Sequence, residues 1–231
     1  MTDERTWERF GAITGLGFIV LTLVATFLYP QQPRVDSAPA VTLKWVHDHH
    51  TGIKTGMVLG LFGAALLFWF VGHLRHVLHD ERLSPIVFGS GIGLAVVSAL
   101  AAVPLGLLAF MDAQGGITSP DVVRLLGDLT TVLYAVATAV TMVFLFALGL
   151  AISQKELASP WLAWVSLLGA VLNGIAVVES MTFSTYHGAA WAIPGWGAFI
   201  GLLLVVLGIS VSLLRARAVS PDRPTVVAAA A

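Results

Sequence analysis

The stretch WVHDHHTGIKTGMVLGLFGAALLFWFVGHLRHVLH, residues 45–79, decides the fold. Residues 57–72 at its middle carry no charge, and histidines lie at both of its ends. In hydrocarbon a backbone must satisfy its own hydrogen bonds, so such a stretch crosses a membrane as a helix and leaves its polar ends at the two interfaces. The other hydrophobic segments of the chain must pack around this helix.

The composition of the whole chain agrees with a membrane protein. Of its 231 residues 57% are hydrophobic and 11% are charged, whereas about a quarter are charged in soluble proteins, and the mean hydropathy is +0.88. The net charge of -1 gives no basic face for nucleic acid. The absence of cysteine excludes disulfides, thiolate metal sites and cysteine nucleophiles. We therefore expect an all-α, polytopic transmembrane helical bundle.

Six spans are predicted within one domain of residues 1–215, at about residues 10–29, 52–78, 86–110, 121–152, 161–181 and 196–214. The first is too long for the core of a signal peptide and has acidic residues before it, so we expect it to be retained. After a proline-rich connector, residues 40–50 predict a short interfacial helix that leads into span two. The tail, residues 216–231, has no pattern and is expected to be disordered.

The distribution of positive charge predicts the orientation. Six spans place both termini on one side of the membrane. Eight of the twelve lysines and arginines fall on the side of the termini and four on the other side: Arg5, Arg9, Arg75, Arg82, Lys155, Arg215, Arg217 and Arg223 against Arg34, Lys44, Lys54 and Arg124. Because positive residues favour the cytoplasm, we expect both termini there.

Span four begins with charged residues that hydrocarbon disfavours. Asp128 follows Asp121 by seven residues, which places it about 10 Å into the span. A carboxylate at that depth needs a partner or a wet cavity, and Arg124, at i−4, is within reach on the same helix. Two interpretations stay open: an ion pair that holds span four, or a carboxylate at the floor of an outward-facing pocket.

A second polar group lies at the same membrane level. Glu179 is near the outer end of span five, Asn173 is six residues deeper, and Tyr186 and His187 follow in the next connector. By itself Glu179 is typical of a residue at the membrane–water interface. Asn173 is typical of a residue that forms a hydrogen bond between helices. If the groups converge, the candidate catalytic residues are Asp128, Glu179 and His187. The ligand pocket would then be completed by Asp48, His49, Arg124, Asn173 and Tyr186.

His47 and His50 are spaced i, i+3, so both project from one face of a helix. This spacing can supply two imidazoles to a divalent metal, Zn or Cu, with Asp48, Asp128 or Glu179 as an oxygen ligand. The alternative is a pair of hydrated interface histidines, because H-x-x-H lacks the glutamate of the H-E-x-x-H metalloprotease pattern.

Three further histidines lie at the C-terminal end of the same span. His73, His76 and His79 lie near Arg75 and predict a polar helix end beside the lipid head groups, with His76 in reach of Asp80. A transmembrane b-type haem usually needs imidazoles from facing helices. One span carries nearly every membrane histidine here, so we expect no haem.

The order of several features resembles a group of bacterial proteins. These features are WERFGAITGLGFIVL near the N-terminus, the Asp48-His49 pair before span two, the LFWFVGHLRHVL ending and the third span rich in small residues. Together they resemble an uncharacterised family of bacterial six-helix integral membrane proteins, over most of residues 7–215. The resemblance implies six helices in a bacterial inner membrane, with recurring polar residues at Asp48-His49 and near Asp128. It implies no activity, and His47 and His50 fall outside it.

Three functions stay open, and the sequence does not decide whether the protein is an enzyme. The first is a non-catalytic protein that binds a lipid-like ligand or a partner subunit through an outward-facing polar pocket. The second is a membrane-embedded enzyme, metal-dependent or not, that acts on an apolar substrate. The third is a transporter or proton pathway through Asp128 and Asn173, although no matching acid follows in the inner half. In each case the partner is the lipid bilayer and not nucleic acid.

Overall fold

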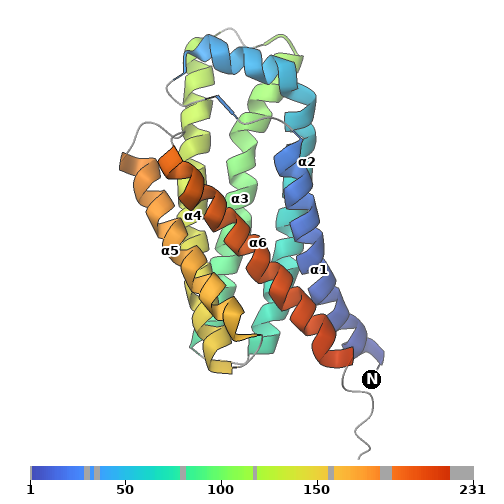
Figure 1. Cartoon of the computed structure of the whole chain (residues 1–231). Coiled ribbons are helices and arrows are strands. Elements are labelled where there is room, and N and C mark those ends of the chain that lie inside the picture. Colours follow the sequence, from blue (N-terminus) through green and yellow to red (C-terminus); the bar gives the residue numbers. More distant parts are fainter. Residues whose placement is uncertain are drawn as a thin grey trace, which may run out of the picture.

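The computed structural model describes residues 2–28, 32–33, 37–78, 82–116, 119–155, 159–182 and 189–218. Within these residues the chain forms six α-helices (Figure 1): α1 Thr2–Phe27, α2 Pro39–Leu78, α3 Leu83–Ala113, α4 Pro120–Lys155, α5 Pro160–Thr182 and α6 Ala189–Ala218. Each helix contains a segment long and apolar enough to cross a membrane. The predicted all-α, six-span transmembrane bundle is therefore confirmed.

The helices extend beyond the predicted spans where local sequence favours it. Pro39, Pro120 and Pro160 each begin a helix, in the position where proline's fixed φ and missing N–H cost least. The predicted interfacial segment, residues 40–50, is continuous with span two in the single helix α2. Figure 1 shows the first turns of α2 lying across one end of the bundle before the chain turns along it.

Two helices are much longer than a bilayer requires. α2 has 40 residues and α4 has 36, which at 1.5 Å per residue are about 60 and 54 Å. A hydrocarbon core is about 30 Å thick. The N-terminal ends of α2 and α4 extend past the C-terminal end of α5 (Figure 1). We call this end of the bundle, which also holds Asp112, the Asp112 end, and the opposite end the His73 end.

The helices close into a ring. Each packs against the next in sequence, α6 returns to pack against α1, and α2 also meets α4. Figure 1 shows α6 running obliquely across the other helices, from beside α5 to the N-terminal part of α1. Residues far apart in sequence are therefore brought together where α1, α2 and α6 meet.

Two hydrophobic clusters hold the ring. The larger draws buried side chains from all six helices, among them Phe70 of α2 and Phe144 of α4. The smaller, which we call the cap cluster, lies at the Asp112 end and consists of Val46, Ile53, Leu105, Leu108, Ala109 and Val123. Close helix packing at the small residues of α3 occurs at Gly91, where a Cβ would lie 2.7 Å from both methyl groups of Val71.

Candidate functional site

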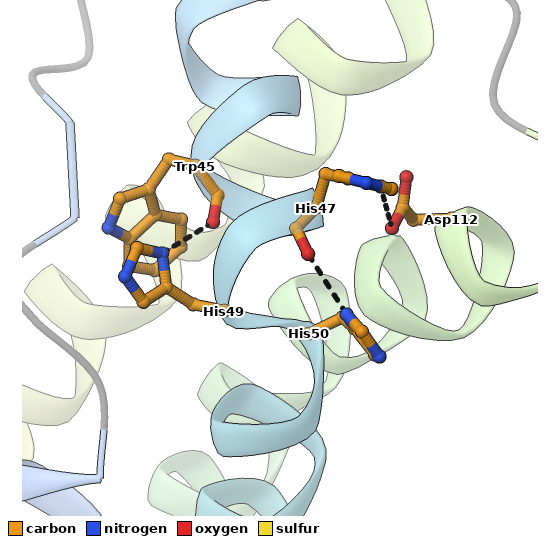
Figure 2. Close-up of polar contacts among 5 residues, drawn as sticks. All are labelled: Trp45, His47, His49, His50 and Asp112. Carbon is orange, nitrogen blue, oxygen red and sulfur yellow. Dashed lines mark hydrogen bonds and ion pairs between the residues drawn. The ribbon is translucent and has the colours of Figure 1, made fainter.

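The Asp112 end joins a histidine of α2 to an acid of α3. His47 Nδ1 lies 3.2 Å from Asp112 Oδ2 (Figure 2), with side-chain exposures of 73% and 13%. Asp112 is in the last turn of α3, which stops because Gly115 adopts a positive φ of 68°. The Gly115 and Gly116 N–H groups bond back to the carbonyls of Asp112 and Met111 at 2.9 Å. This turn fixes the carboxylate beside α2.

The other two histidines of this end bond to their own helix. His49 Nδ1 donates to the Trp45 carbonyl at 2.7 Å, and His50 Nδ1 donates to the His47 carbonyl at 2.9 Å (Figure 2). A carbonyl only accepts, so Nδ1 carries the hydrogen in both rings and Nε2 is left as an acceptor when the ring is neutral. Figure 2 shows His49 beside Trp45, on the opposite side of α2 from His47 and His50.

The described residues do not gather a metal-binding set. No group of three or more histidine, aspartate or glutamate side chains is close enough there to hold an ion. The His47 and His50 ring centroids are 6.5 Å apart, and the partner of His47 is Asp112 rather than Asp48, Asp128 or Glu179. A zinc site takes three or four protein ligands, so the predicted Zn or Cu site stays a prediction that no contact favours.

The predicted pair on α4 is present. Arg124 Nε lies 3.9 Å from Asp128 Oδ2, and the two side chains are 75% and 50% exposed. Residues 129–154 of α4 carry no charge, and 26 residues rise about 39 Å, which is enough to cross the hydrocarbon without Asp128. Asp128 therefore fits at the edge of the span better than at the predicted depth inside it.

A shallow depression adjoins this pair. Its volume is about 30 Å³, and it is lined by Gln32, Pro33, Ser37, Pro39, Thr42, Val123, Arg124, Gly127 and Asp128. The α1–α2 connector thus faces the start of α4. A volume of this size holds about two water molecules, whereas pockets that enclose small ligands measure roughly 300–1,000 Å³. The depression can receive a polar group but does not enclose a whole ligand.

Asn173 and Glu179 of α5 form no hydrogen bond with these groups in the described structure. Asn173 is buried, and its Nδ2 donates to the Gly169 carbonyl at 2.7 Å. That bond lies within α5, so the predicted interhelical hydrogen bond is not the one formed. Glu179 is half-buried, and its Oε2 has no hydrogen-bond partner among the described residues. Tyr186 and His187 lie outside the described residues.

The sequence reasoning missed the environment of His73. This residue was expected at a solvated helix end, but it is buried, with 6% exposure. It packs against Gly11 of α1 so closely that a Cβ on Gly11 would overlap the imidazole ring. The Gly11-x-x-x-Gly15 spacing in α1, which is typical of close helix approach in membranes, is the signal that could have revealed this contact. His79 and Asp80 lie outside the described residues.

In comparisons with family models, curated proteins and solved structures, nothing matches this chain. The helices alone define its class, a multi-pass helical membrane protein. The resemblance to a bacterial family stays a prediction.

Proposed function

We propose that the protein binds a lipid-like molecule, without catalysis, by receiving its polar head group in the depression between the α1–α2 connector and α4. The observation that carries this proposal is the exposed Arg124–Asp128 pair in the wall of a depression at the edge of a membrane span. At the N-terminal end of α4, these are the charged side chains nearest to its uncharged part, residues 129–154.

The chemistry of the pair suits a phospholipid head group. The guanidinium of Arg124 can bind a phosphate through two parallel hydrogen bonds, and Asp128 can accept from an ammonium or hydroxyl group. Exposed i, i+4 ion pairs contribute only about 0.3–0.5 kcal/mol. Arg124 can therefore exchange its carboxylate partner for a phosphate at little cost.

The surface beyond the depression suits acyl chains. Leu125, Leu129 and Val132 of α4 are exposed large hydrophobic residues next to the pair. A lipid whose head group occupies the depression can lay its chains along this part of α4. The small depression supports this mode of binding because only the head group needs to enter it. The metal-dependent form of the enzyme alternative has less support, because the described histidines, aspartates and glutamates form no group of three or more that could hold a metal ion.

We further propose that both termini face the cytoplasm of a bacterium, with the depression at the outer surface of its inner membrane. The excess of lysine and arginine at the His73 end supports this orientation. The chain has no cysteine, so single-cysteine variants are clean reporters. A membrane-impermeant maleimide added to intact spheroplasts should label Gln114→Cys, which is exposed at the Asp112 end, and spare Gln154→Cys, which is exposed at the other. The reverse pattern would overturn the orientation.

Native mass spectrometry tests whether the protein binds a phospholipid. The protein is extracted in mild detergent, and a zwitterionic phospholipid, phosphatidylethanolamine, is titrated onto it. Arg124→Gln should weaken binding several-fold. Lys54→Gln should leave it unchanged, because Lys54 is a cation of α2 that lies over the Phe110 ring, outside the depression. Equal binding by the wild type and both variants would refute the proposal. Retention of a second protein in place of lipid would instead favour a partner subunit.

A further inference from the structure

Most buried polar side chains in the described structure bond to a backbone carbonyl. Eight polar side chains are buried there: Thr14, His73, Ser84, Thr130, Thr141, Ser166, Asn173 and Ser210. Six of these donate to a carbonyl oxygen at 2.7–3.2 Å. The exceptions are His73 and Ser210: both ring nitrogens of His73 and the Ser210 Oγ have no hydrogen-bond partner there. Unpaired buried polar atoms are costly and rare.

The two exceptions pack on the same face of the same helix. A Cβ on Gly11 of α1 would overlap the His73 ring, and a Cβ on Gly15 would overlap Ser210 Oγ and lie 2.7 Å from Phe70 Cδ2. Gly11 and Gly15 are one turn apart on one side of α1. His73 and Phe70 come from α2 and Ser210 comes from α6, so the residues that carry the three unpaired atoms pack on one face of α1, at its junction with α2 and α6.

We propose that His73 and Ser210 form a buried water-binding site at this junction. One water with two hydrogen bonds of about 2.8 Å bridges polar atoms up to about 5.6 Å apart, and the successive turns of α1 on which the two side chains pack are about 5.4 Å apart. Buried waters typically make about three hydrogen bonds to otherwise unpaired groups. The imidazole supplies one acceptor and one donor, and the serine hydroxyl supplies both. Thr14 Oγ1 of the same helix, which donates to the Gly11 carbonyl, keeps acceptor capacity.

With this site, the His73 end of the bundle has a buried imidazole in contact with water, whereas the Asp112 end has the proposed lipid site. An imidazole that contacts water inside a membrane span can exchange protons with that water, and ionisable groups placed there are functional candidates by default. The proposed lipid site lies at the other end of the bundle, so neither proposal depends on the other.

Hydroxyl-radical labelling tests the water site. Radicals are generated by an X-ray pulse in H₂¹⁸O on the full chain in nanodiscs, and labelled side chains are read by mass spectrometry. Phe70 and Phe144 are matched probes, since both are phenylalanines with 0% exposure and each packs against a glycine. Phe70 should be labelled several-fold faster than Phe144. Equal labelling of the two rings would overturn the proposal.

A His73 variant tests whether the water depends on the ring nitrogens of this residue. His73→Phe keeps an aromatic ring and removes both nitrogens, so Phe70 labelling should fall to the level of Phe144. Ser166→Ala is the control, because Ser166 is a buried serine that already donates to the Leu145 carbonyl; it should leave Phe70 labelling unchanged. If His73→Phe does not fold, Ser210→Ala takes its place, with at least a twofold fall expected. Phe70 labelling that persists without these polar atoms would refute the site.

Discussion

Adding one methyl group at Gly91 should separate α2 from α3, whereas the same change at Gly89 should not. A Cβ on Gly91 would lie 2.7 Å from Val71 Cγ1 and Cγ2 and 3.1 Å from Phe144 Cε2, while a Cβ on Gly89 meets nothing within 4 Å. Both glycines belong to α3, two residues apart. The pair of substitutions therefore isolates the contact from every other effect of Gly→Ala.

The magnitude follows from these distances. Ordinary contact with a Cβ begins at 3.4 Å, so Val71 must retreat by about 0.7 Å. Val71 is fully buried, and in a helix valine has one strongly preferred rotamer. The side chain therefore cannot rotate away, and the backbones of α2 and α3 must move apart. Overpacking of this kind costs about 1–3 kcal/mol. The helix-propensity gain of Gly→Ala, up to about 1 kcal/mol, is common to both variants and cancels in their difference.

The assay is thermal unfolding in detergent, followed by fluorescence of the seven tryptophans. For a chain of this size 1 kcal/mol corresponds to roughly 2–4 °C, so Gly91→Ala should melt about 2–12 °C below Gly89→Ala. The double variant Val71→Ala/Gly91→Ala should lose less stability than the sum of its single changes, because the two sites share one contact. Equal melting temperatures for the two glycine variants would refute the packing described for α2 and α3.

Three further outcomes test other parts of the structure. Asp128→Asn should move the melting temperature by less than about 2 °C, since its ion pair is long and half-exposed; a large loss would mean that the carboxylate is structural. Leu108→Ala should cost about 2–5 kcal/mol and, because Leu108 belongs to the cap cluster, hydrogen exchange should rise in residues 39–53 far more than in α5; a uniform rise would contradict a separate cluster. Ser166→Ala should cost about 0.6 kcal/mol in unfolding free energy, because its bond to the Leu145 carbonyl joins two helices, whereas Ser153→Ala, which loses only a bond to Leu150 in its own helix, should change nothing measurable.

The sequence predicted those features that are local in the chain. The six spans follow from apolar runs about as long as a bilayer is thick. The Arg124–Asp128 pair follows from i, i+4 spacing on one helix. Each of these needs only the residues of one segment and the geometry of a helix.

Contacts between segments could not be predicted, because the residues of one segment do not show which residues of another segment lie beside them. His47 and Asp112 are 65 residues apart, and no spacing rule connects the start of α2 with the last turn of α3. The burial of His73 depends on the missing side chain of Gly11 in another helix. The predicted depth of Asp128 stays a prediction. It assumes that α4 begins at the membrane surface, whereas the 36 residues of α4 are more than a bilayer requires.

The histidines of α2 show why residue type alone does not identify a site in this protein. At the Asp112 end, where α2 extends beyond the length that a bilayer needs, each ring satisfies Nδ1 with a nearby carbonyl or carboxylate and no ligand is required. At the other end His73 has the same chemistry, but it is packed against Gly11 of α1 and neither ring nitrogen finds a partner in the described structure. The free energy of an unpaired polar atom rises with burial. Among the described histidines, the demand for an additional hydrogen-bonding molecule is therefore strongest at His73, which is buried with both ring nitrogens unpaired, and not in the stretch His47–His50.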